Sequence, residues 1–328
     1  MKKHLMPFTF KYGALLFIGL VIIFFSFQNE HFFTYNNITD ILRSISIVTF
    51  VAIGVTIALA VDGFDLSVGA TMSLSTVVTA TLMVWYELPL VLVIVIPIVV
   101  GAIVGLLNSL LIVRIRIPDL LATLAVMYIV NGIHKTYTKG YSIYNNMPLS
   151  DGSTAPGKMR EDFLWIGQGK LFGVPFPVIL MLIAVIAMHL FFKYTRWGRQ
   201  LIMTGGNEEA ARLSGLRVKR VRTYAYIASG IFAAIGGILF AARIGSGQID
   251  AGAPYLMEAV AAVFVGYSVF AAGRPNIIGT FVGAVLMGVM VNGMTMMNID
   301  YFKTDIARGI VLVLALAVTF IHHNRKKA

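Results

Sequence analysis

Long apolar segments alternate with short polar ones along most of this chain. A helix needs about 20 predominantly apolar residues to cross the hydrocarbon core of a bilayer. Ten segments approach this length: 12–29, 43–61, 66–84, 88–113, 119–138, 174–192, 223–244, 257–272, 277–297 and 305–322. The eighth segment is short, so its helix is either tilted or only partly inserted in the bilayer. We therefore predict an all-α, polytopic transmembrane helix bundle with about ten spans, and treat residues 1–328 as one transmembrane domain.

Basic residues predict the orientation of these spans, because Lys and Arg concentrate in cytoplasmic loops. With the N-terminus inside, alternation places Arg114, Arg116, the 193–222 loop and the 325–327 tail inside, and the mixed-charge 139–173 loop outside. Both termini are therefore expected to be cytoplasmic. The first apolar segment is followed by no small-residue cleavage site, so we expect it to be retained as a span.

Composition agrees with a membrane protein. The chain is 58% hydrophobic and 12% charged, with a mean hydropathy of +0.83, whereas a soluble domain carries about twice that share of charge. The net charge of +11 comes from a few loops between spans, a pattern that sets topology and meets anionic lipid. We therefore expect the lipid bilayer, and not nucleic acid, as the partner of these basic residues.

Motifs for catalysis and nucleotide binding are absent from the sequence. There is no Gly-x-x-x-x-Gly-Lys-Ser/Thr loop for phosphate, no His-Glu-x-x-His zinc helix, no Gly-x-Ser-x-Gly elbow and no Cys. His322 and His323 lie in the tail, which is more typical of a solvated end than of a metal site. We expect no catalytic residues, no metal and no cofactor on this chain.

The 193–222 loop carries eight basic and two acidic residues and has the signals of a short helix. Asn207 suits the N-cap, Glu208 and Glu209 place negative charge in the first turn, and Gly215 can end the helix. A short capped helix on a cytoplasmic loop is either a docking surface for another protein or a solvated connection. Spacing alone does not decide between the two.

The run Gly-Gly-Asn-x-x-Ala-Ala-Arg-x-Ser-Gly in this loop resembles the coupling-helix motif of ABC importer permeases of the ribose and simple-sugar group, a branched-chain amino acid-like transport family. The similarity continues through Asp65-Leu66-Ser67-Val68-Gly69 upstream, and through Glu258-Ala-Val-Ala-Ala and Gly279-Thr280 downstream. The resemblance implies a helix that binds a separate ATPase subunit. The residues assigned to this coupling role are Gly206, Asn207, Glu208, Glu209, Ala210, Ala211, Arg212 and Gly215.

The resemblance implies the membrane-spanning permease subunit of an ATP-binding-cassette importer in the plasma (inner) membrane. It would move a small polar solute, with a monosaccharide or related sugar as the first expectation. ATP would be bound by a cytosolic ATPase, an extracytoplasmic solute-binding protein would deliver the solute, and a second copy of the chain would complete a homodimer. The alternative is an ion-driven secondary transporter, which would need buried carboxylates such as those of Asp62 and Asp65.

Polar residues inside apolar segments are the candidates for lining a pathway. Asp62-Gly63-Phe64-Asp65 interrupts the apolar run from 45 to 84, either as a capped tight turn or as a discontinuous helix beside a cavity. We favour a structural role for Asp65, because capping is the commoner use of such a residue. The family usually has Gly-Gly where this chain has Asp62-Gly63, which makes the substrate class less safe to transfer. The pathway candidates are Asp62, Asp65, Ser67, Asn108 and Asn292.

Small residues and scattered charges give three further expectations. Gly101 and Gly105 form a small-xxx-small pair suited to close helix packing. The order of Gly101, Asn108, a polar break and the next span echoes that of Gly283, Asn292, a break and the last span, as in an inverted repeat. Three charged residues flank one outer loop and are expected either to pair with one another or to sit at the interface: Arg243, Asp250 and Glu258.

Overall fold

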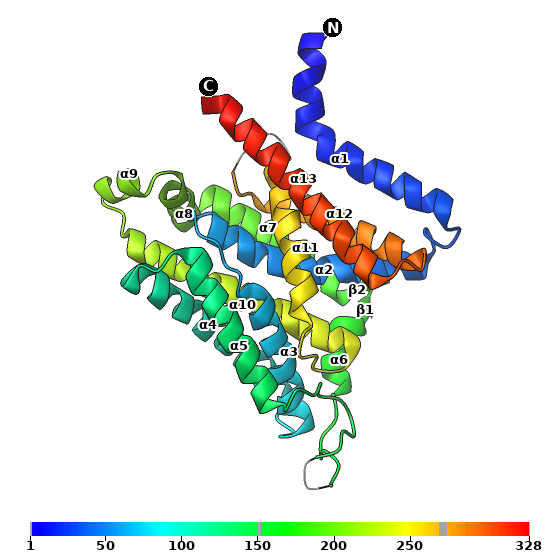
Figure 1. The fold of residues 1–328 in the computed structure, drawn as a ribbon. Coiled ribbons are helices and arrows are strands. Elements are labelled where there is room, and N and C mark those ends of the chain that lie inside the picture. Colours follow the sequence, from blue (N-terminus) through cyan, green and yellow to red (C-terminus); the bar gives the residue numbers. More distant parts are fainter. Residues whose placement is uncertain (1, 150–151, 269–273, 328) are drawn as a thin grey trace.

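Helices account for nearly all the regular structure of the chain (Figure 1). The computed structural model describes residues 2–149, 152–268 and 274–327, with side chains for 15–149, 152–267 and 274–317. The helices are α1 (Lys2–Gln28), α2 (Tyr35–Leu59), α3 (Val68–Val84), α4 (Leu90–Ser109), the π-helix η1 (Leu110–Ile115), α5 (Asp119–Tyr137), α6 (Glu161–Gln168), α7 (Phe176–Tyr194), α8 (Arg196–Gly206), α9 (Glu208–Leu213), α10 (Val218–Ile244), α11 (Gly252–Ser268), α12 (Ile277–Met296) and α13 (Tyr301–Lys327). Strands β1 (Lys170–Leu171) and β2 (Val174–Pro175) pair as an antiparallel hairpin.

Five of the described helices are long and apolar enough to cross a membrane. They are α2, the continuous run Leu90–Ile115, α7, α10 and α12. Shorter apolar helical stretches are Leu15–Gln28, Val68–Val84 and Gly252–Tyr267. The prediction of a helical membrane protein is confirmed, while the count of ten spans stays a prediction. Residues 269–272 of the predicted eighth span and the side chains of His322 and His323 lie outside the described part of the chain.

Helices α2 and α10 run antiparallel through the centre of the bundle, where small residues let backbones approach. Gly54 of α2 lies against the carbonyl oxygen of Ser229 in α10. Helix α4 also packs on α10, where Gly101 meets Gly230 and Gly105 meets the backbone of Tyr226. Both contacts are so close that neither Gly101 nor Gly105 has room for a Cβ atom. The packing role predicted for Gly101 and Gly105 is therefore confirmed.

The two halves of the bundle share one order of elements. Helix α2, the break at 60–67, and α3 to α5 are matched by α10, the break at 245–251, and α11 to α13. Packing is matched as well, because α4 packs on α10 as α12 packs on α2. The first turns of α3 and α11 meet where Gly69 contacts the backbone of Gly252. Both observations agree with the inverted repeat that the sequence suggested.

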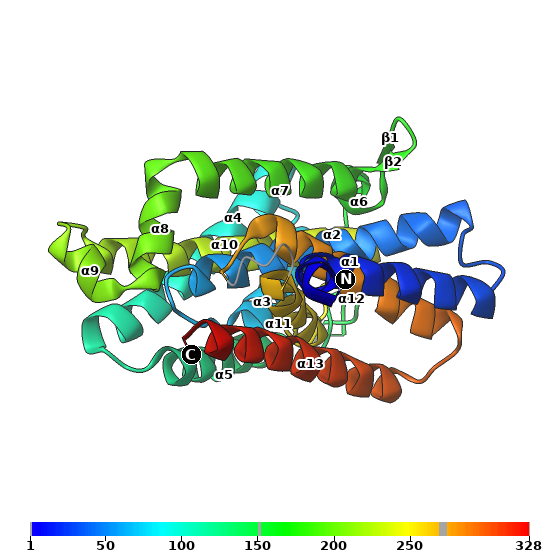
Figure 2. The ribbon, with the colours of Figure 1, turned by 90° about the horizontal axis from the view of Figure 1, so that it is seen from above.

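The bundle has two distinct ends, which Figures 1 and 2 both show. Helices α8 and α9 lie at one end, together with the C-terminal end of α13, and we call this the α9 end. Helix α6 and the β1–β2 hairpin lie at the opposite end, which we call the hairpin end. The short elements between the long helices therefore lie at two separate ends of the bundle, α8 and α9 at one and α6 with the hairpin at the other.

Several elements differ from the hydropathy prediction because polar turns extend the helices. Helix α2 begins at Tyr35 instead of 43, and α10 begins at Val218 instead of 223. Hydropathy misses these turns because they contain polar side chains. Asn37 and Arg222 hydrogen-bond to residues of other helices and do not face lipid. The 193–222 loop contains α8 as well as the expected short helix, and the 139–173 loop contains α6 and the hairpin.

Candidate functional site: a short exposed helix, a polar cluster and an outer cavity

Helix α9 has the boundaries that its sequence signals predict. The Asn207 side chain accepts a hydrogen bond from the backbone nitrogen of Ala210, 2.9 Å away, which satisfies one free donor of the first turn. Glu208 and Glu209 lie in that first turn. Gly215 follows the helix with φ of +84°, a conformation that glycine adopts without strain. Capping thus fixes where this short helix begins and ends.

Most of α9 faces away from the rest of the chain. Ala211 is buried against the bundle, whereas Gly206, Ala210 and Arg212 are exposed. Leu213 has 79% of its surface exposed, which is unusual for a large apolar side chain next to charged ones. The sequence analysis did not include Leu213 among the coupling residues, although an apolar residue at the end of a polar helix was the available signal.

Glu208 connects α9 to the bundle through an ionic network. The Arg222 guanidinium at the start of α10 donates to both carboxylate oxygens of Asp119 in α5, at 3.0 and 2.8 Å, and to Glu208 at 3.3 Å. The hydroxyl of Tyr226 also donates to Asp119, at 2.6 Å. Since Arg222 and Asp119 are mostly shielded from solvent, their contact between α5 and α10 is stronger than a surface ion pair, whereas the link to α9 ends on the exposed Glu208.

A second contact joins α8 to the break between α2 and α3. Gly205 lies so close to the carbonyl oxygen of Ala60 that a Cβ atom would clash with it. The neighbouring Gly206 has open space at the same position. The α9 end therefore contacts the break directly, backbone against backbone.

Three predicted pathway residues meet Ser229 in one hydrogen-bonded group, which we call the polar cluster: Asp65, Ser67, Asn108 and Ser229. One carboxylate oxygen of Asp65 accepts from the backbone nitrogen of Ser67 at 2.9 Å, from the Ser67 hydroxyl at 2.6 Å and from the Asn108 amide at 3.3 Å. The other accepts from Ser229 at 2.8 Å. Asp65 is only 1% exposed, so four donors offset the cost of its burial.

The remaining two pathway candidates lie apart from this cluster. Asp62 is exposed at the turn after α2, with φ of +56°. Asn292, in the last turns of α12, donates from its amide to the side-chain oxygen of Asn37 at 2.9 Å. Ser229 was not predicted, because a lone serine in an apolar helix carries little signal.

Asn292 lines a cavity of about 660 Å³ at the hairpin end, which we call the outer cavity. Its walls come from α2, α10, α11, α12, α13 and the 245–251 connection. Arg308 of α13 and Glu258 of α11 both line the cavity. The Arg308 guanidinium donates to the Glu258 carboxylate at 2.6 Å, and Glu258 is only 5% exposed. An ion pair within an apolar bundle indicates a functional position, because charges are costly there.

The charged residues that flank this region do not pair with one another, which corrects one of the two sequence expectations. Arg243 donates to the hydroxyl of Ser44 at 2.8 Å. Asp250 pairs with Lys135 at 2.8 Å, and Glu258 pairs with Arg308. Each of the three residues instead has a partner on another element: Ser44 on α2, Lys135 on α5 and Arg308 on α13.

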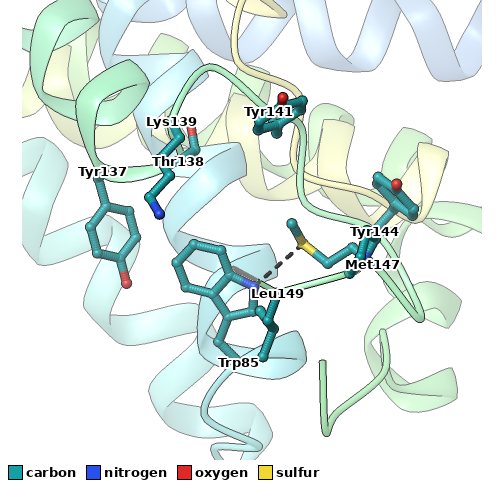
Figure 3. A pocket seen from close by; sticks show the side chains of 9 residues that line it. Trp85, Tyr137, Thr138, Lys139, Tyr141, Tyr144, Met147 and Leu149 are labelled. Atoms are coloured by element: carbon teal, nitrogen blue, oxygen red, sulfur yellow. Dashed lines mark hydrogen bonds between the residues drawn. The ribbon is translucent and has the colours of Figure 1, made fainter. Parts of the chain in front are cut away.

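An aromatic pocket of about 580 Å³ lies between the end of α3, the end of α5 and the segment 138–149 (Figure 3). Trp85 donates from its indole nitrogen to the sulfur of Met147 at 3.3 Å, and its ring lies 5.3 Å from that of Tyr137. Tyr141 and Tyr144 are exposed at its rim. Such Trp and Tyr residues are typical of the belt at a membrane–water interface. Within the described ranges, no group of three or more His, Cys, Asp or Glu residues is placed to hold a metal ion.

These features define a class: a multi-pass helical membrane protein whose apolar helices enclose polar groups and whose short capped helix projects from one end. Residues 37–319 match the family described as the permease component of the branched-chain amino acid transport system, so the chain belongs to that family of transport permeases. It is therefore a transport component and not an enzyme.

Curated relatives are similar over nearly their whole length. The ribose import permease protein RbsC of Escherichia coli K12 is 32% identical over 305 residues, which cover 93% of this chain and 92% of that protein. RbsC of Bacillus subtilis 168 is 33% identical over 318 residues, 97% of this chain and 94% of the relative. The galactose/methyl galactoside import permease protein MglC of E. coli K12 is 31% identical over 337 residues, 99% and 98% of the two chains. No solved structure matches the chain.

Proposed function

We propose that this chain is the membrane-spanning permease subunit of an ATP-binding-cassette importer that carries a monosaccharide or related sugar across the plasma (inner) membrane. The observation that carries the proposal is the end-to-end similarity to ribose and galactose import permeases. The capped, exposed helix at the position of the coupling motif supports it from the structure. ATP is bound and hydrolysed on a partner chain in this proposal.

Helix α9 is the proposed contact with the cytosolic ATPase. Its exposed face offers Glu208, Glu209, Arg212 and the apolar Leu213, a combination of charged rim and apolar anchor that suits a protein interface. Force on α9 has two routes into the bundle, the Arg222–Asp119 contact and the Gly205–Ala60 contact. Movement of the ATPase would thereby reach α5, α10 and the break before α3.

The proposed orientation places the α9 end in the cytoplasm. Ten spans would then leave both termini inside, with α6, the hairpin and the outer cavity outside. The hairpin end would receive an extracytoplasmic solute-binding protein, and a second copy of the chain would complete a homodimer. The bundle would switch between two states, with ATP biasing one face and the loaded binding protein biasing the other.

Co-purification of the tagged chain from its native membrane in mild detergent tests the ATPase contact. The expected partner carries a phosphate-binding loop and is lost when Glu208→Lys is combined with Glu209→Lys, while the protein stays in the membrane. A matched reversal at two exposed acids outside the 193–222 segment, Glu30→Lys with Glu161→Lys, should retain it.

Because Glu208 also contacts Arg222, a second variant separates docking from damage to the ionic network. Glu209→Lys with Leu213→Asp changes only side chains that project from α9. Loss of the ATPase from this variant would support docking on α9. Retention of a full complement of ATPase and unchanged uptake in both variants would remove the proposed role of α9.

A further inference from the structure

The outer cavity reaches deep into the bundle. Along α12 it is lined from Thr295, in the last turn, to Gly288, near the middle of the helix. From Gly288 to Thr295 the helix rises about 10 Å along its axis. The first two turns of α11, including Tyr255 and Glu258, form another part of the wall. The cavity therefore runs from the hairpin end toward the level where the first turns of α3 and α11 meet.

The charges of the outer cavity cancel. Arg243 and Arg308 contribute two positive charges to its lining, and Asp250 and Glu258 contribute two negative ones. Arg308 and Glu258 are held together at 2.6 Å. A cavity of this kind presents donors and acceptors without a net charge, so it neither attracts nor repels a single ion strongly, whereas it offers many hydrogen bonds.

Two polar atoms of the lining residues lack partners within the described part of the chain. They are the side-chain oxygen of Asn292, an acceptor, and Nε of Arg308, a donor. Most buried polar groups in proteins are hydrogen-bonded, and both of these atoms are buried beside the cavity and not exposed on its wall. A hydroxyl group both donates and accepts, so it suits the mixed donor and acceptor side chains that line the cavity.

We propose that the outer cavity, with Arg243, Glu258, Asn292 and Arg308 on its walls, is a binding site for a neutral polyhydroxylated solute of monosaccharide size. The inference rests on the proposed function and assigns the solute a place on this chain. The volume corresponds to about 20 water molecules at ~30 Å³ each, which leaves room for a sugar with part of its hydration shell. Pockets for small ligands fall in the same range, about 300–1,000 Å³.

The absence of cysteine from the chain makes a direct test available. Val291→Cys places one thiol on the wall of the outer cavity. Phe172→Cys places one in the β1–β2 connection, where the native side chain is 97% exposed, and Val313→Cys places one on α13 at a 64% exposed position that does not line the cavity. Each variant is labelled with a membrane-impermeant maleimide in the assembled transporter, with and without added sugar.

The probes are D-ribose and D-galactose as neutral solutes, galacturonate as an anion and glucosamine as a cation. We expect Val291→Cys to be labelled, and a neutral sugar at about three times its dissociation constant to slow that labelling about fourfold. Galacturonate and glucosamine should give little protection. Phe172→Cys should be labelled equally with every solute, and Val313→Cys should resist the water-soluble reagent, because the predicted span 305–322 places it within the bilayer.

Other outcomes overturn the proposal in defined ways. No labelling of Val291→Cys means that water does not reach the cavity from the hairpin end. Labelling that no sugar slows removes the binding site, and stronger protection by the anion or the cation than by both neutral sugars removes the neutral class. Equal slowing at Phe172→Cys shows an effect outside the cavity and also counts against it.

Sugar uptake by the unmodified transporter separates this inference from the proposed function. ATP-dependent uptake together with an unprotected Val291→Cys would leave the importer standing and reject the outer cavity as the sugar's site. A transporter that moves no sugar with ATP would reject the proposed function itself.

Discussion

The polar cluster and the outer cavity contain similar side chains but differ in how those side chains are partnered. Each holds at least one buried carboxylate and an asparagine inside an apolar bundle. In the polar cluster Asp65 receives four hydrogen bonds and is only 1% exposed. In the outer cavity Glu258 receives a hydrogen bond from Arg308, and space remains beside the pair. The four donors around the Asp65 carboxylate indicate a structural group, while the space beside the Glu258–Arg308 pair leaves room for a ligand.

This difference corrects a simple rule for membrane proteins. An ionisable residue in a span is by default a candidate functional site, and both Asp65 and Glu258 satisfy that rule. The number of partners and the presence of space distinguish them. We therefore expect substitutions in the polar cluster to affect folding, and substitutions in the outer cavity to affect transport.

The largest effect is expected from Asp65→Ala. It leaves donors of Ser67, Asn108 and Ser229 without their acceptor in a buried place, and we expect the protein to lose about 4 kcal/mol of stability. Thermal unfolding of the purified protein in detergent measures this. The control Asp62→Asn, at an exposed carboxylate three residues earlier whose left-handed backbone asparagine also adopts, should cost less than about 0.5 kcal/mol. Equal losses from both variants would contradict the structural role of Asp65.

The pair in the outer cavity should separate stability from transport. Glu258→Gln leaves Arg308 with Asp305 as its remaining ionic partner beside a cavity that admits water, so we expect a loss of about 2 kcal/mol, below the 3–5 kcal/mol typical of a closed pair. Adding Arg308→Gln should restore most of that stability, because the uncompensated charge is removed. Uptake should stay about tenfold below the unmodified protein in both variants. Recovery of uptake together with stability would make the pair purely structural.

Gly205→Ala should have an intermediate effect, through the backbone next to the polar cluster. A Cβ atom at this position meets the carbonyl oxygen of Ala60, so we expect a loss of about 1.5 kcal/mol and weaker coupling of ATP hydrolysis to uptake. Gly206→Ala has open space and should leave thermal stability unchanged. The comparison fails if the two alanine variants unfold at the same temperature.

The smallest expected effect on stability comes from Asn292→Leu. It removes one hydrogen bond to Asn37, worth about 1 kcal/mol, but it also makes the cavity wall apolar. We expect uptake to fall about fivefold. Asn37→Ala breaks the same hydrogen bond and also the bond from the Asn37 amide to the carbonyl oxygen of Phe32, at a residue that does not line the cavity, so it should lower stability more and spare uptake. Normal substrate kinetics in Asn292→Leu would indicate packing alone.

Local sequence signals predicted most of the helices and the boundaries of α9. Hydropathy finds apolar segments because lipid requires them, and capping acts between near neighbours such as Asn207 and Ala210. Elements that depend on tertiary contacts were missed. Helix α8 and the first turn of α10 are polar and basic, and their place is set by contacts such as Gly205 with Ala60 and Arg222 with Asp119.

Pathway candidates were predicted only as a list, because their grouping depends on distant residues. Asp65 lies 164 positions from Ser229, and Glu258 lies 50 positions from Arg308. Spacing on one helix carries no information about such pairs. Arg308 could have been found, since it is a charged residue within the predicted span 305–322. No local signal marks Ser229.

Reconstitution of the purified assembly in liposomes tests the central claim most directly. The measurement is uptake of radiolabelled ribose and galactose with the co-purified ATPase, the binding protein and ATP on the α9 side. Our account predicts uptake that requires ATP and is abolished by Glu209→Lys with Leu213→Asp. Uptake by the chain alone, driven by an ion gradient without ATP, would contradict the account and make this protein a secondary transporter.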